Sequence, residues 1–256
     1  MKQTTTLRTL SFDGLETRIL SLSEIMLGRI GSKEQKYPAK PFEISLLIEE
    51  VVAEYTKVNP FLDAKLVSEA ARISYEAHEG YKRKNGLPYI VHPYQVGYIL
   101  ALMGMDFETI AAGLNHDAIE KSGAGRKNIT EKIMKSLGEH VLEMVLGVTR
   151  IPDSEISLSG YDCDTMDKLL RMMKEKKPDA RIDAINVADG ISNLLSMDGL
   201  KAGPNNFFDE RMKSIQNSEL YVKPAASRLD NTFGLDGNFR FYDFVVLLIQ
   251  RGRTSI

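Results

Sequence analysis

The chain has 256 residues, 43% of them hydrophobic and 27% charged, which suffices for one large globular domain or two small ones. Its formal charge of −2 gives no general attraction to nucleic acid, so we expect no general nucleic-acid binding. The single cysteine, Cys163, excludes an internal disulfide and a cysteine-rich zinc ribbon, and neither a secretory leader nor a run of about eighteen apolar residues is present, so we expect a cytoplasmic protein without a membrane span.

Apolar residues at three- and four-residue steps predict a series of helices. Residues 42–55 carry one such apolar stripe, and Asn59 with Pro60 ends it. Asp63 is suited to cap the next helix, which we expect over 64–79. We expect the first forty residues to be weakly ordered or peripheral.

A basic loop follows the second of these helices. Pro93 suits the first turn of a helix that begins just after His92 and ends at Gly104. Asp106 is placed to cap another helix, which we expect to run without a break through Glu120. The sequence Ser-Gly-Ala-Gly then stops it.

The second half of the chain continues the helical pattern. Asn128 with Glu131 resembles a capping pair for a helix through Leu146, and residues 181–195 form a further apolar helix. The Ser- and Asp-rich stretch 151–165 is typical of an exposed loop. No useful period-two alternation occurs, so the predicted fold class is all-α.

Four polar residues stand out on these hydrophobic helices. A single histidine on an apolar face is usually a hydrogen-bonded core residue, and an adjacent His-Asp pair is common by chance. A set of two imidazoles and two carboxylates is different, because buried carboxylates need a partner. One divalent cation would satisfy all four, and mixed nitrogen and oxygen ligands suit Mn²⁺, Fe²⁺ or Zn²⁺. The candidate ligands are His92, His116, Asp117 and Asp189.

Two further side chains share helical faces with these candidates. Glu120 lies four residues after His116, and Asn193 lies four residues after Asp189. The loop 82–86 adds cations that would attract phosphate, although a run of basic residues is as often a solvated surface.

The stretch 76–120, EAHEGYKRKNGLPYIVHPYQVGYILALMGMDFETIAAGLNHDAIE, resembles the hydrolase domain of RelA/SpoT-type alarmone enzymes, which belong to the HD-domain metal-dependent phosphohydrolases. The resemblance covers about 64–200, with GVTRI at 147–151 and VADGISNLLSM at 187–197. A weaker similarity to the segment that closes this domain is found in SELYVKPAASRLDN, at 218–231. The resemblance implies a compact helical HD bundle over 63–256, preceded by an extension over 1–62 that contains one amphipathic helix.

The resemblance also implies roles for individual residues. His92, His116, Asp117 and Asp189 match the family's metal ligands, with Mn²⁺ as the usual ion. The remaining matches concern substrate and proton transfer: Arg83 and Lys84 would hold phosphates, Asn85 is a small polar position beside them, Glu120 is the first acid of a catalytic Glu-Asp pair, and Asn193 contacts the nucleotide.

Two positions depart from the family pattern. Lys121 stands where the second catalytic acid is expected, and Gly190 stands where an arginine usually follows the ligand aspartate. A protonated lysine is suited to bind a substrate phosphate or to shield charge on a leaving group. The alternative is an exposed lysine near a helix end, where its charge favours the helix dipole.

The resulting hypothesis is a hydrolase that removes the 3′-pyrophosphate of guanosine tetra- or pentaphosphate and leaves GDP or GTP. The chain has no room for the synthetase domain of long family members, so we expect it to degrade the alarmone. One alternative keeps the metal chemistry but acts on another phosphorylated nucleotide such as NADPH. Another is a decayed nucleotide-sensing or partner-binding module, with helix 42–55 as the partner surface. A homo-oligomer is compatible with the sequence but not specified by it.

Overall fold

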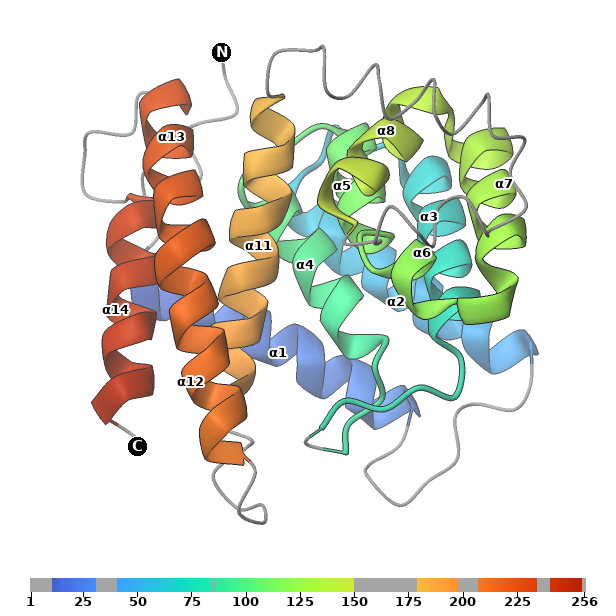
Figure 1. Ribbon diagram of the computed structural model, residues 1–256. Helices are drawn as coiled ribbons and strands as arrows, with labels where there is room; N and C mark the ends of the chain where they lie inside the picture. The colour runs from blue at the N-terminus through green and yellow to red at the C-terminus, as the bar shows by residue number, and fades with distance from the viewer. Residues whose placement is uncertain are drawn as a thin grey trace.

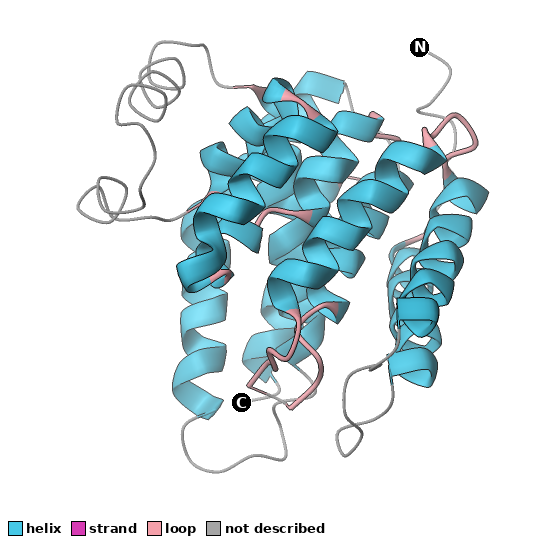
Figure 2. Cartoon of the chain, turned by 90° about the vertical axis from the view of Figure 1, so that its right-hand side faces the viewer, coloured by secondary structure: helices cyan, strands magenta, loops and turns pink. Residues whose placement is uncertain are grey.

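The computed structural model describes residues 11–30, 41–84, 86–149, 179–197, 207–233 and 240–254. Helices dominate this part of the chain, and it contains no strand, only one isolated bridge between Lys82 and Pro88 (Figure 2). The predicted all-α class is therefore confirmed. Within the described ranges, no helix has the length and apolar character needed to cross a membrane.

The α-helices have these bounds: α1 Phe12–Ile30, α2 Pro41–Val58, α3 Ala64–His78, α4 Val91–Leu102, α5 Phe107–Leu114, α6 Ala118–Lys121, α7 Arg126–Leu137, α8 Glu139–Val148, α11 Ala180–Ser196, α12 Phe207–Asn217, α13 Lys223–Phe233 and α14 Phe241–Thr254. A short 3₁₀ turn covers Gly123–Gly125, and a π-helical turn covers Ser218–Val222.

Helix α4 lies at the centre of the bundle, and every one of its residues is buried. It packs against α5 and α11, while α11 in turn packs against α13 and α14 (Figure 1). Helices α3, α6 and α7 lie together on the other side, and α1 and α2 both contact α4. Because α4 is buried on every side, it has no solvent face, and the other helices enclose it.

The predicted caps at two helix starts are confirmed. The Asp63 carboxylate accepts a hydrogen bond from the amide of Leu66 at 3.0 Å, and that of Asp106 accepts from the amide of Thr109 at 2.8 Å. Each cap satisfies an amide that has no partner inside its own helix.

Helix α1 contradicts the expectation of weak order or a peripheral position for residues 12–30, the helical part of the first forty residues. Its side chains Leu15, Ile19, Leu22 and Met26 are all buried in the same hydrophobic core as the later helices. The apolar stripe of α1 has the spacing of an ordinary core-facing helix. The division of the chain at residue 62 stays a prediction, and the predicted loop 151–165 lies outside the described residues.

The predicted helix over 107–120 is also wrong in one respect, because it is interrupted. Helix α5 ends at Leu114 and α6 begins at Ala118. Asn115 lies at the break, where its side-chain amide donates to the carbonyl oxygens of Ala70 and Ala111 at 3.1 and 3.0 Å. This break matters for the site, since neighbouring residues within a continuous helix point in different directions.

A second predicted helix is divided too. Helix α7 begins at Arg126, so Asn128 lies inside the first turn and does not cap it. Gly138 separates α7 from α8 with a φ of 94°, a left-handed conformation that glycine adopts without strain.

Candidate metal centre and phosphate cleft

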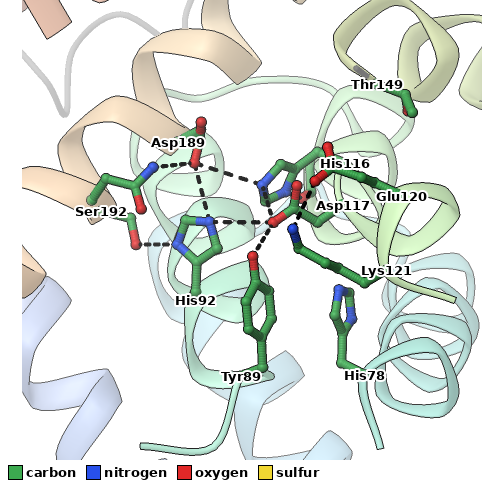
Figure 3. A network of polar contacts seen from close by, with 12 residues as sticks. His78, Tyr89, His92, His116, Asp117, Glu120, Lys121, Thr149, Asp189 and Ser192 are labelled. Carbon is green, nitrogen blue, oxygen red and sulfur yellow. Dashed lines mark hydrogen bonds and ion pairs between the residues drawn. The ribbon is translucent and has the colours of Figure 1, made fainter. Parts of the chain in front are cut away.

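The four predicted metal ligands converge on one point from three parts of the chain. His92 lies in the first turn of α4, and Asp189 lies in the middle of α11. His116 and Asp117 lie in the break between α5 and α6, where the non-helical backbone lets both neighbouring side chains face the same space (Figure 3). We call His92, His116, Asp117 and Asp189 the His/Asp cluster.

Short distances join these groups. The Nε2 atom of His92 lies 3.1 Å from Oδ1 of Asp189, and that of His116 lies 3.6 Å from the same oxygen. The Oδ2 atom of Asp117 lies 3.9 and 3.5 Å from the Nε2 atoms of His92 and His116. Within the described residues, ligand atoms of His92, His116 and Asp117 all lie within 4.8 Å of one another, as a metal site requires.

The orientation of His116 fits a metal ligand. Its Nδ1 atom lies 2.8 Å from the carbonyl oxygen of Gly113, which only accepts hydrogen bonds. A neutral His116 therefore carries its proton on Nδ1, and its Nε2 lone pair faces the carboxylates. That Nε2 atom is buried and has no hydrogen-bond partner. A lone pair facing two carboxylates is unfavourable unless a positive charge lies between them, and a divalent cation with nitrogen and oxygen ligands supplies it.

The electrostatics of the cluster also favour a bound cation. Burial alone would raise the pKa of Asp117, but the imidazoles of His116 and His92, the hydrogen bond from Tyr89 and the charge of Lys121 together lower that pKa well below its usual range. Burial likewise lowers the pKa of His116, yet Asp117 and Asp189 outweigh it and raise that pKa. Burial and the charge of Arg83 lower the pKa of His92 to about 4. The carboxylates therefore stay ionised and draw positive charge into the cluster.

Tyr89 supports the cluster from below, and sequence reasoning missed it. Its hydroxyl donates to Oδ2 of Asp117 at 2.6 Å. Its ring stacks on the imidazole of His78, with centroids 5.1 Å apart and planes 6° apart (Figure 3). The sole signal in the sequence is a tyrosine three residues before His92, in a segment that is otherwise apolar.

A cleft of about 280 Å³ opens above the cluster and is lined by His92, His116, Asp117 and Asp189 together with Glu120 and Lys121. A second cleft of about 460 Å³ adjoins it, and the two share Tyr89, Lys121 and Asn193 among their lining residues. Five basic residues line the second cleft, and no acidic residue of the described chain does. We call them the basic mouth: Lys82, Arg83, Lys84, Lys121 and Lys213.

A chain of hydrogen bonds connects the basic mouth to the cluster. Arg83 donates through Nη2 to Oδ1 of Asn193 at 2.7 Å, and Asn193 donates through Nδ2 to Oδ1 of Asp189 at 2.7 Å. The second terminal nitrogen of Arg83, Nη1, is buried without a hydrogen-bond partner. A buried guanidinium N–H group in this position is suited to donate a hydrogen bond to an anionic ligand. Lys84 lines the same cleft, whereas Asn85 lies outside the described residues.

Glu120 and Lys121 form an ion pair at the junction of the two clefts. The Nζ atom of Lys121 donates to Oε1 of Glu120 at 2.7 Å and lies 5.7 Å from the centroid of the Tyr89 ring. Burial would lower the pKa of Lys121, but its hydrogen bond to Glu120 and the charge of Asp117 raise it. Lys121 is thus a fixed cation and not a base.

The second departure from the family pattern, Gly190, has a structural cause. A Cβ atom at this position would lie 2.5 Å from both methyl groups of Val222, on the π-helical turn that follows α12. Such a distance is far below van der Waals contact, so only glycine allows α11 and this turn to approach so closely. Gly190 is therefore a packing residue in this chain.

Comparison with known proteins agrees with this site. A sequence profile described as the HD domain matches residues 70–218. A probable GTP pyrophosphokinase of Mycobacterium leprae (strain TN) is 31% identical over 195 residues, which cover 76% of this chain and 23% of that protein. A guanosine-3′,5′-bis(diphosphate) 3′-pyrophosphohydrolase of Borreliella burgdorferi is 33% identical over 168 residues, covering 65% of this chain and 23% of the relative.

A third relative is the bifunctional (p)ppGpp synthase/hydrolase SpoT of Escherichia coli (strain K12). It is 30% identical over 165 residues, or 64% of this chain and 22% of SpoT. The chain thus spans about a quarter of the length of the curated relatives it matches.

Proposed function

The chain belongs to the HD-domain family, and on that basis we propose that it is a metal-dependent phosphohydrolase that removes the 3′-pyrophosphate of guanosine tetra- or pentaphosphate. The observation that carries the proposal is that a cluster of candidate metal ligands, two of them carboxylates, adjoins a cleft lined by positively charged side chains. The His/Asp cluster attracts a cation, and the basic mouth beside it attracts phosphate. The names of the relatives from Borreliella and Escherichia support the guanosine substrate.

His92, His116, Asp117 and Asp189 would hold the ion, with Mn²⁺, Fe²⁺ or Zn²⁺ as candidates because the ligands are two nitrogens and two oxygens. When bound, such an ion lowers the pKa of a coordinated water and polarises a phosphoryl oxygen. Mn²⁺ is the ion we would test first, since the resemblance to RelA/SpoT-type enzymes implies it.

The chain's own residues supply the remaining functions. Water attacks the phosphorus attached to the ribose 3′ oxygen, and the bond between that phosphorus and the 3′ oxygen breaks. Pyrophosphate is released, and the 3′ oxygen takes up a proton. Glu120, at the rim of the cluster, orients this water and accepts its proton. Arg83 and Lys84 bind phosphate oxygens, and Asn193 positions the nucleotide.

Lys121 lies where the phosphates would enter, and its ammonium group would exchange Glu120 for a phosphate oxygen. This exchange releases the carboxylate of Glu120 at the moment when substrate binds. The same lysine also favours a second candidate, hydrolysis of another phosphorylated nucleotide such as NADPH, since the acidic partner of Glu120 is replaced. For either activity we propose that the protein works in a reducing cytoplasm. Its binding partner is the phosphorylated nucleotide.

The test is turnover of guanosine tetraphosphate and NADPH by the purified chain, with Mn²⁺ and after chelation. Pyrophosphate released from the alarmone in the presence of Mn²⁺ supports the first proposal. Release of phosphate from NADPH, with no hydrolysis of guanosine tetraphosphate, supports the second proposal. Nucleotide binding without turnover of either compound, with metal bound, contradicts both and indicates a sensing module.

A further inference from the structure

One hydrogen-bond chain of the site begins in helix α1, none of whose residues lines either cleft. Ser23 of α1 donates through its hydroxyl to the carbonyl oxygen of Ile19 at 3.1 Å. Gln95 of α4 donates through Nε2 to the oxygen of Ser23 at 2.5 Å. The chain then crosses to α11, where the hydroxyl of Ser192 donates to Oε1 of Gln95 at 2.7 Å.

The last member of this chain is a residue of the His/Asp cluster. The Nδ1 atom of His92 lies 2.8 Å from the oxygen of Ser192 (Figure 3). Gln95, Ser192 and His92 are buried, so water does not compete with these contacts. Ser23 is half-buried, on the side of α1 that contacts α4.

Each donor in the chain is determined by the one before it. The chain starts at the hydroxyl of Ser23, which donates its single proton to the carbonyl oxygen of Ile19. The oxygen of Ser23 must then accept, which requires the NH₂ group of Gln95 to face it. The amide oxygen of Gln95 consequently faces Ser192 and takes its single proton. Ser192 has only an acceptor left for His92, so Nδ1 of His92 must carry a proton.

We propose that helix α1 fixes the tautomer of His92 through this one-way chain, and that Ser23, Gln95 and Ser192 are positioning residues of the metal site. In neutral His92, a proton on Nδ1 leaves Nε2 with a lone pair directed at the cluster, 3.1 Å from Asp189. This is the form of imidazole that binds a metal. The inference rests on the proposed metal site for its purpose, but its geometry is independent of it.

Without the chain, the opposite tautomer is favoured. Asp189 is an ionised acceptor beside Nε2, and it draws a proton to that atom when no cation is bound. A proton on Nε2 must be displaced before metal binds. Helix α1 therefore opposes Asp189 and holds the site ready for the ion, which gives the N-terminal helix a function in addition to its packing.

The test compares Ser23→Ala with Ser21→Ala, because Ser21 is exposed on the same helix and lies outside the chain of hydrogen bonds. The tautomer of His92 is read from its ¹⁵N shifts in metal-free protein near neutral pH. Metal-free protein is essential, since a bound ion would itself leave the proton on Nδ1. We expect Nδ1–H in the wild type and in Ser21→Ala, and a shift towards Nε2–H in Ser23→Ala.

Metal affinity gives a second readout. We expect Ser23→Ala to weaken Mn²⁺ binding by roughly 10-fold, the lower end of the range for residues that orient metal ligands. Ser192→Ala should weaken it further, because it removes the direct partner of Nδ1, and circular dichroism will show whether this buried variant folds. An Nε2–H tautomer in the wild type, or an unchanged tautomer in folded Ser192→Ala, would overturn the inference. Wild-type protein with Nδ1–H that binds none of Mn²⁺, Fe²⁺ and Zn²⁺ would instead refute the proposed function and leave the hydrogen-bond chain intact.

Discussion

The His/Asp cluster and the basic mouth lie side by side and share Tyr89, Lys121 and Asn193, yet they are built in opposite ways. The cluster is deeply placed, with both imidazoles buried, and its side chains come from helices or from the break between two helices. The mouth is more exposed, and three of its five cations come from the loop before α4.

The difference teaches which property each region needs. A metal ligand must be held within a few tenths of an ångström, which buried helices and hydrogen bonds achieve. Phosphate recognition tolerates longer and more mobile contacts, because charge attraction falls off slowly with distance. Substitutions in the cluster should therefore act on metal binding and turnover together, whereas substitutions in the mouth should act on substrate affinity alone.

Asp117→Ala should have the largest effect. It removes a carboxylate that contacts both imidazoles and accepts from Tyr89, so we expect loss of bound Mn²⁺ and of turnover. Metal content by mass spectrometry and product release by chromatography measure the two. Asp63→Ala, at the start of α3, is the control that should retain both. Full activity in Asp117→Ala would show that the His/Asp cluster is not needed for turnover, and would contradict the distinction between the two regions.

Arg83→Ala should come next. The lost charge-assisted hydrogen bonds correspond to about 1.5–3 kcal/mol, or roughly 10- to 100-fold in KM for guanosine tetraphosphate. Bound Mn²⁺ should be retained, because Arg83 supplies no ligand atom and its side-chain contacts end at Asn193 and the Tyr89 ring. Steady-state kinetics and metal analysis on the same sample separate the two effects. Loss of metal in this variant would show that the mouth and the cluster are one unit.

Gly190→Ala tests the backbone that carries both regions. The added methyl group would meet Val222 at 2.5 Å, so we expect a loss of about 1–3 kcal/mol in the free energy of unfolding. Gly28→Ala is the matched control, since nothing lies within 4 Å of a Cβ atom there. Thermal denaturation followed by circular dichroism compares them. Equal stability of Gly190→Ala and wild type would remove the packing explanation for this glycine.

Lys121→Asp should have the smallest effect. It tests the residue that lines both the metal cleft and the basic mouth. Lys121 is about one-third exposed, and a contact of this kind contributes at most about 1 kcal/mol, so we expect KM for the alarmone to rise roughly fivefold. Lys121→Arg keeps the cation and should stay close to wild type. A large gain of alarmone turnover in Lys121→Asp would instead mean that the lysine attenuates an inherited activity.

Much of this protein follows from its sequence. Helical periodicity, the capping residues Asp63 and Asp106, and the all-α class depend on contacts between residues a few positions apart, which the order of residues encodes directly. The chemical types of His92, His116, Asp117 and Asp189 and the family resemblance identified the cluster before any distance was known.

Only the tertiary structure decided how these residues work together. The break at Asn115 depends on acceptors from α3 as well as α5, and the glycine at 190 has its reason in Val222, 32 positions later. The role of α1 depends on Gln95 and Ser192, which lie on two other helices. Such features rest on partners that are distant in sequence, and their geometry exists only after the helices have packed.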